Sequence, residues 1–119
     1  MGKTINFNYK DVDYTLEYTR ATVRLMENRG FNIDDIVSNT KPVTAIPMLF
    51  HGAFMAHHNP SDRNTTNPVD RKLADEIYSH ITERTELITK LVSMYIEPLN
   101  DLIENPEESE GNLKWEANW

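Results

Sequence analysis

Cysteine is absent from the sequence, which excludes disulfide frameworks, thiolate metal sites and cysteine nucleophiles together. Glycine is scarce, and the chain contains neither a glycine-rich phosphate-binding loop nor a Gly-x-Ser-x-Gly nucleophile elbow. No apolar run has the length of a signal peptide or of a membrane span. The sequence therefore suits a reducing cytoplasm, and it predicts no cofactor and no membrane partner.

Basic residues are also in short supply. Lys and Arg number 12 against 19 Asp and Glu, so the formal net charge is −7 at pH 7. A nucleic-acid-binding surface needs clustered Lys and Arg, so we expect no nucleic-acid partner. The last sixteen residues contain five Glu and one Lys, which contributes −4 and leaves −3 for the rest. Residues 104–119 are therefore an acidic appendage to a nearly balanced body.

Alternating apolar residues near the N-terminus predict a β-hairpin over residues 4–18. Ile5, Phe7 and Tyr9 alternate with polar residues, and the same pattern returns after a short turn. A two-stranded hairpin is only marginally stable by itself in water. We therefore expect the following helices to pack on its apolar face.

Helical spacing and capping residues predict helices over residues 19–29, 33–39, 44–58 and 68–103. Thr19 is placed to cap the first helix, and Gly30 to close it in the left-handed conformation. Asn67 is expected to cap the last and longest helix, with Pro68 as its first residue. Pro98 should kink or end that helix.

The predicted fold is mainly α (α+β), in a single globular domain over residues 1–103. An N-terminal β-hairpin packs on a small bundle of about four helices. Residues 104–119 lack periodicity and are polar, so we predict a flexible acidic C-terminal tail.

The stretch MLFHGAFMAHHNP contains three of the four histidines. On a continuous helix, His51 and His58 share a face but are separated by a rise of about 10.5 Å. Two nitrogens bound to one zinc ion at about 2 Å each cannot lie so far apart. We therefore predict no metal site and interpret the histidines as a helix end, where they oppose the helix dipole. The alternative is a small metal-binding module that uses His51, His57, His58 and His80.

The helix that carries these histidines has two apolar stripes. The first is expected to face the core: Ile46, Leu49, Phe50, Ala53 and Phe54. The second lies on another side and is a hypothetical oligomer or partner interface: Met48, His51, Met55 and His58. Methionine suits adaptable contact surfaces, so this stripe could face another copy of the chain. The alternative is a helix that is buried entirely within its own fold.

The acidic tail carries aromatic residues that such segments normally lack. Leu113, Trp115 and Trp119 are therefore candidate docking residues for a partner protein. The alternative is that the tryptophans pack on the body of the same chain. Catalysis has little support, because the neighbouring Ser79 and His80 diverge on a helix. We predict a protein that is not an enzyme.

The order of five sequence stretches resembles a known family. These stretches are INFNYKDVDYTLEYT, RATVRLMENRGF, LFHGAFMAHH, LITKLVSMY and EGNLKWEANW. Together they resemble the tail assembly chaperones of siphovirus-type bacteriophages and of prophages in Gram-positive hosts. The likeness spans essentially the whole chain, and LFHGAFMAHH and GNLKW match best.

The resemblance implies a small, mainly helical homo-oligomer without catalytic activity. Such a protein acts with a longer frameshifted isoform, coats and solubilises the tape measure protein, and recruits tail tube subunits during tail morphogenesis. It implies action in the cytoplasm of the bacterial host and absence from the mature virion. The other alternative is a phage-encoded adaptor that binds a host protein through its tail.

Overall fold

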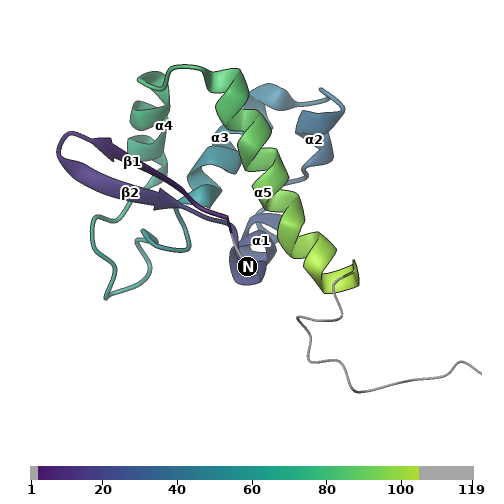
Figure 1. The fold of residues 1–119 in the computed structure, drawn as a ribbon, viewed down its shortest axis with the longest axis horizontal. Helices are drawn as coiled ribbons and strands as arrows, with labels where there is room; N and C mark the ends of the chain where they lie inside the picture. Colours follow the sequence, from purple (N-terminus) through teal and green to yellow (C-terminus); the bar gives the residue numbers. More distant parts are fainter. Residues whose placement is uncertain (1–2, 105–119) are drawn as a thin grey trace, which may run out of the picture.

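The computed structural model describes residues 3–104 of the chain. Its elements follow in the order β1 (Ile5–Tyr9), β2 (Val12–Leu16), α1 (Arg20–Asn28), α2 (Asp34–Val37), α3 (Pro42–Ala53), α4 (Arg71–Ser79) and α5 (Arg84–Glu104) (Figure 1). This N-terminal hairpin followed by helices confirms the predicted architecture. The predicted acidic tail lies, apart from its first residue, outside the described residues.

The hairpin follows directly from the alternating pattern. Phe7 lies opposite Tyr14 in the antiparallel register. Lys10 and Asp11 form the turn with positive φ angles of 51° and 66°. Positive φ at both turn positions gives the type I′ twist that matches the two strands. The apolar face is turned towards the helices, and the ring of Phe54 lies 6.2 Å from that of Phe7 and 5.8 Å from that of Tyr14.

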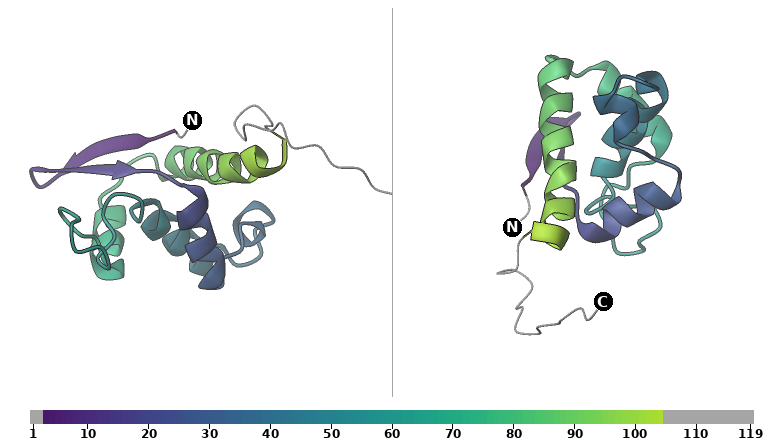
Figure 2. Two further views of the ribbon diagram at one scale, coloured as in Figure 1. Left: turned by 90° about the horizontal axis from the view of Figure 1, so that it is seen from below. Right: turned by 90° about the vertical axis from the view of Figure 1, so that its right-hand side faces the viewer.

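The elements form two layers, with the hairpin and α5 in one and the four shorter helices in the other (Figure 2). α3 is the central helix and contacts α1, α2, α4 and α5. Four residues of its predicted inner stripe are at most 1% exposed: Leu49, Phe50, Ala53 and Phe54. Their burial confirms that this stripe builds the core, whereas Ile46 at its start is partly exposed.

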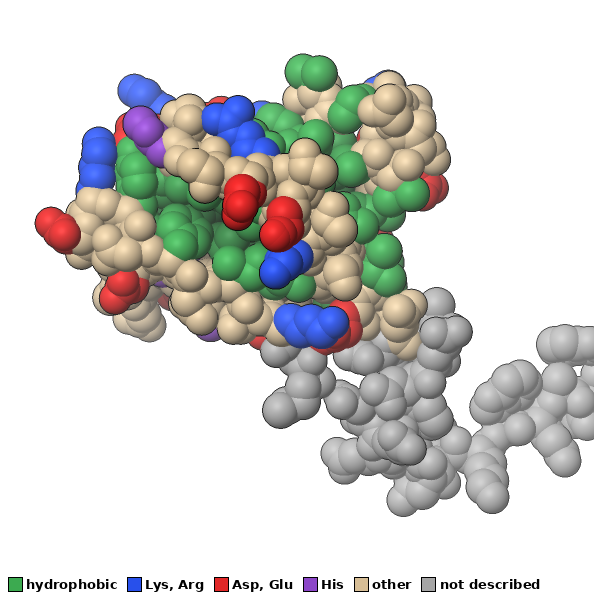
Figure 3. All heavy atoms as spheres, turned by 45° about the horizontal axis from the view of Figure 1, so that its top comes forward, with side chains coloured by type: hydrophobic (Ala, Val, Ile, Leu, Met, Phe, Trp, Pro, Cys, Tyr) green, Lys and Arg blue, Asp and Glu red, His purple; other side chains and the backbone are tan. Residues whose placement is uncertain are grey.

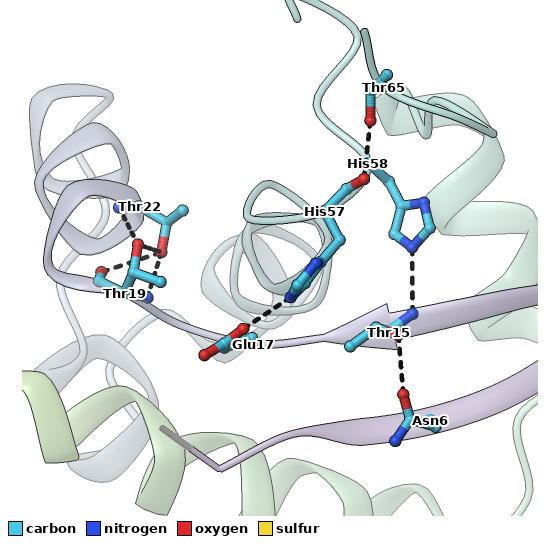
Figure 4. Close-up of polar contacts among 8 residues, drawn as sticks. All are labelled: Asn6, Thr15, Glu17, Thr19, Thr22, His57, His58 and Thr65. Atoms are coloured by element: carbon cyan, nitrogen blue, oxygen red, sulfur yellow. Dashed lines mark hydrogen bonds and ion pairs between the residues drawn. The ribbon is translucent and has the colours of Figure 1, made fainter. Parts of the chain in front are cut away.

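Both predicted caps of α1 are confirmed. The Thr19 hydroxyl accepts the N–H of Thr22 at 3.1 Å, and the Thr22 hydroxyl accepts the N–H of Thr19 at 2.8 Å (Figure 4). This reciprocal capping box satisfies two amides that the first turn leaves without helical partners. Gly30 has a φ of 93° just after the helix, a conformation that glycine adopts without a Cβ clash.

α3 ends earlier than predicted, at Ala53 rather than near residue 58. In a continued helix the carbonyl of Ala53 would accept the N–H of His57. It instead accepts the N–H of Glu17 at 2.9 Å, at the end of the hairpin. The hairpin therefore takes the hydrogen-bond acceptor that the next helical turn needs. The predicted helix end at His57 and His58 is wrong.

The predicted helix over residues 68–103 is in fact two helices. α4 ends before His80, and α5 begins at Arg84 after Glu83, whose φ is 53°. The Arg84 side chain donates to the carbonyls of Ser79 and Ile81 at 2.9 and 3.2 Å, so carbonyls at the break are satisfied. The polar Arg84 and Thr85 interrupt the apolar pattern of the predicted helix, and they lie at the start of α5, directly after this break.

Two further details of these helices differ from the prediction. Asp70, not Asn67, caps α4, and its carboxylate accepts the N–H of Leu73 at 2.8 Å. Asn67 has a φ of 54° and lies three residues before this cap, so Pro68 precedes the helix and is not its first residue. Pro98 does not end α5, which continues to Glu104.

Candidate functional site

An open apolar groove lies between β1 and the N-terminal half of α5. Figure 3 shows apolar side chains gathered there, with charged side chains around them. The larger hollow has a volume of about 310 Å³, and a neighbouring hollow of about 220 Å³ extends it along β1. The apolar lining of the larger hollow consists of Ile5, Phe7, Leu16, Phe50, Ile81 and Leu87. Glu83, Glu86 and Lys90 line its α5 side. We call this feature the β1–α5 groove.

The two edges of the hairpin differ in their hydrogen bonding. At the outer edge of β2, the N–H of Thr15 donates to Nε2 of His58 at 3.1 Å, and the N–H of Glu17 donates to the carbonyl of Ala53. Asn6 lies opposite Thr15, so its N–H and C=O also point away from the partner strand. Across residues 3–104, no backbone hydrogen bond is made at the outer edge of β1. The groove thus lies beside an edge with unpaired backbone groups.

A hydrogen bond and two ion pairs attach the hairpin to helices at the two ends of this groove. The Tyr9 hydroxyl donates to the Glu76 carboxylate at 2.6 Å, and Nζ of Lys10 lies 3.3 Å from the same oxygen. The hydrogen bond from Tyr9, followed by that from Lys10, lowers the pKa of Glu76. At the other end, Nζ of Lys3 lies 3.5 Å from a carboxylate oxygen of Glu97 on α5. The hairpin is therefore attached to α4 at its tip and to α5 at its base.

His58 connects three parts of the chain and is only 6% exposed. Its Nε2 accepts the N–H of Thr15, so Nδ1 must carry the proton of the neutral ring (Figure 4). Nδ1 lies 3.2 Å from the carbonyls of both Thr66 and Asn67. The ring also meets that of Tyr14 at a centroid distance of 5.2 Å. His58 therefore joins the hairpin to the loop that leads into α4.

The other histidines have separate environments. Nε2 of His57 lies 2.7 Å from the Glu17 carboxylate in an exposed pair. Nε2 of His51 lies 3.2 Å from the carbonyl of Val69, and His80 is the C-cap of α4. In the part of the chain that the structure describes, no group of three His, Asp or Glu side chains could hold a metal ion.

The four residues of the hypothetical interface stripe do not lie on one helix, because α3 ends at Ala53, before Met55 and His58. Met55 is 5% exposed and His58 is 6% exposed, so each side chain leaves little surface for a partner. The interface hypothesis itself stays a prediction. Met48 and His51 are partly exposed and line a small hollow of about 80 Å³ between α1, α3 and α4. Met55 lines the same hollow as Leu25 and Met26 of α1, whereas His58 is covered by Tyr14 of the hairpin and by the loop before α4.

His51 is the titratable group of this small hollow. Burial lowers its pKa from the usual 6.5, against the opposing effect of the hydrogen bond to the Val69 carbonyl. The guanidinium groups of Arg71 and Arg29, which also line the hollow, lower the pKa further. The neutral ring is therefore favoured in the folded protein.

The candidate docking residues Leu113, Trp115 and Trp119 lie outside the described residues, so their role stays a prediction. The groove itself was not predicted from the sequence. A signal was present in the adjacent Leu87 and Ile88, because neighbouring apolar residues on a helix face different directions. Leu87 lines the β1–α5 groove, whereas Ile88 lines a hollow on the other side of α5.

Comparison with known proteins places the whole chain in one family. The sequence model of the family described as Domain of unknown function (DUF5055) matches residues 1–119. Neither the curated proteins nor the solved structures contain a significant match. Within residues 3–104, no helix is both long enough and apolar enough to cross a membrane.

Proposed function

The chain belongs to the DUF5055 family, and for this member we propose the role of a non-enzymatic phage tail assembly chaperone. In this role it self-associates, coats and solubilises the tape measure protein, and recruits tail tube subunits during tail morphogenesis. A longer frameshifted isoform acts with it in the bacterial cytoplasm, and neither remains in the mature virion. The order of sequence stretches that resembles these chaperones supports the proposal.

The observation that carries this proposal is the β1–α5 groove beside a strand edge that has no backbone partner among the residues the structure describes. Its apolar lining can cover apolar side chains of another polypeptide, and the backbone groups of Asn6 can pair with that polypeptide's main chain. Main-chain pairing tolerates many sequences, which suits a protein that coats a long partner. Glu83, Glu86 and Lys90 add charges of both signs to the lining.

Co-expression with the tape measure protein from the same gene cluster tests this role. We expect the wild-type protein to keep the tape measure protein in the soluble fraction. Replacing Leu87 by Asp places a charge in the apolar lining and should abolish this effect. Val43→Asp is the matched control, because Val43 is 86% exposed on α3 and lies outside the groove lining.

Circular dichroism establishes first that each variant is folded, and Leu87→Gln serves as a milder groove variant. A tape measure protein that stays insoluble with the wild-type chain would overturn the chaperone role. Equal activity of the wild type and both Leu87 variants would show that the groove is not the binding site. Light scattering of the purified protein tests self-association, for which a strict monomer at high micromolar concentration is the contrary result.

A further inference from the structure

The C-terminal tail as a whole lacks periodicity, but its last seven residues taken alone have the pattern of a β-strand. Leu113, Trp115, Ala117 and Trp119 are apolar and alternate with Lys114, Glu116 and Asn118, a period of two that places each set on its own face. We propose that residues 113–119 add to the free edge of β1 as a third strand within the same chain. The apolar side chains of this strand then occupy the β1–α5 groove.

The edge of β1 offers the required hydrogen-bonding groups. Asn6 lies opposite Thr15, and Asn8 lies opposite Asp13 two residues further along. Because the N–H of Thr15 points outward to His58, both pairs are of the type whose main-chain groups face away from the partner strand. Asn6 and Asn8 therefore present donors and acceptors at alternate positions, as an added strand needs.

The side-chain pattern of the added strand matches that of β1. Neighbouring strands align their alternating side chains on the same two faces of a sheet. Ile5 and Phe7 of β1 line the groove, so the apolar set of residues 113–119 falls on the groove side. The set of Lys114, Glu116 and Asn118 then falls on the face of the exposed Asn6 and Asn8. One register thus buries the tryptophans and leaves the charged side chains of this segment, Lys114 and Glu116, in water.

The connecting chain is long enough for docking within one molecule. The contact between Lys3 and Glu97 places the start of β1 beside α5, seven residues before the helix ends at Glu104. Seven helical residues span about 10 Å. Residues 105–112 can extend by about 26 Å, which covers this distance and leads into the groove at Ile5. The added strand would then run in the same direction as β1.

Attachment in the same chain favours this occupant over a second copy. A tethered segment has an effective concentration in the millimolar range, above that of the free protein in most preparations. A partner that binds in the groove would compete with residues 113–119 for the same apolar lining. The inference itself depends only on this chain and holds whether or not the partner is a tape measure protein.

Tryptophan fluorescence of the full chain gives a direct test. Trp115 and Trp119 are the only two tryptophans, so the emission reports on this segment alone. We expect blue-shifted emission, and less quenching by acrylamide than for the same chain unfolded in urea. Leu87→Asp should shift the emission to the red and raise quenching to the unfolded level. Val43→Asp should leave both unchanged, and far-ultraviolet circular dichroism checks that both variants are folded.

Three results would overturn the inference. Wild-type quenching equal to that of the unfolded chain would show that the tryptophans are not covered. Protection that survives both Leu87→Asp and Phe7→Ser in folded protein would place the segment elsewhere. Protection that disappears on dilution together with a dimeric mass in light scattering would assign the groove to a second copy. Because no partner protein is present, these results are separate from the solubility test of the chaperone role.

Discussion

Nε2 of His58 accepts the backbone N–H of Thr15 at 3.1 Å, and this contact covers one edge of the hairpin. The carbonyl of Ala53 accepts the next outward N–H, that of Glu17, at 2.9 Å. The end of α3 and the turn after it thus protect β2, whereas β1 is left beside an apolar groove. This asymmetry explains why the groove side is the candidate binding edge.

The contact of His58 predicts a specific loss of stability. His58→Ala leaves the N–H of Thr15 without its acceptor at a part-buried site, and it also removes ring contacts with Tyr14. We expect a decrease of about 2–3 kcal/mol in the free energy of unfolding, measured by urea titration. His57→Ala breaks an exposed pair with Glu17 and should cost less than about 1 kcal/mol. Equal losses in the two variants would contradict the assigned role of His58.

Burial of Met55 predicts unfolding rather than dissociation when this residue becomes charged. Met55 is 5% exposed, so Met55→Glu places an unpaired carboxylate in the core. We expect a loss of about 3 kcal/mol or more, measured by thermal unfolding with circular dichroism. Val43→Glu at an 86% exposed position should change stability by less than about 0.5 kcal/mol. A folded Met55→Glu protein of lower oligomeric mass would place Met55 at an interface.

The break between α4 and α5 predicts a stabilising substitution. Glu83 has a φ of 53°, a left-handed conformation that costs an L-residue free energy. Glu83→Gly removes this cost and should raise the free energy of unfolding by about 0.5–1 kcal/mol. Glu86→Gly is the control within α5 and should lower it by about 1 kcal/mol. Destabilisation by Glu83→Gly would mean that its side chain contributes more than its backbone strain costs.

Two buried tyrosines predict loss of stability at alkaline pH. Burial raises the pKa of Tyr95 to about 12 and that of Tyr18 well above its usual 10.0. Since the folded protein holds these phenols neutral while the unfolded chain ionises them near pH 10, stability falls as the pH rises from 10 towards 12. Tyr95→Phe should make the free energy of unfolding depend less on pH in this range. An unchanged slope would contradict the assignment to Tyr95.

The sequence predicted the local parts of the fold well. The hairpin follows from alternating Ile5, Phe7 and Tyr9, and the start of α1 from Thr19, because strand faces and helix caps depend on near neighbours. The inner stripe of α3 was also recognisable, since its spacing of three and four residues marks one helix face. These features needed no knowledge of what packs against them.

The position at which α3 ends and the environment of His58 after it depend on residues distant in the sequence. The N–H of Glu17 donates to the carbonyl of Ala53, and the N–H of Thr15 donates to the ring of His58. These donors lie 36 and 43 residues earlier in the chain than their acceptors. No periodicity within residues 44–58 contains that information. The same applies to Met55, which follows the end of α3 and is buried beside the hollow that Leu25 and Met26 of α1 also line.

The sequence by itself determined the element types, the acidic charge and the absence of thiol chemistry, because composition and short-range periodicity suffice for these. Only the tertiary structure decided that the histidines join separate segments and that, within residues 3–104, the outer edge of β1 is left without backbone partners beside an apolar groove. The physical reason is that backbone groups and apolar faces compete for partners across the whole fold. Which strand edge of the hairpin remains open therefore depends on how all the other elements pack.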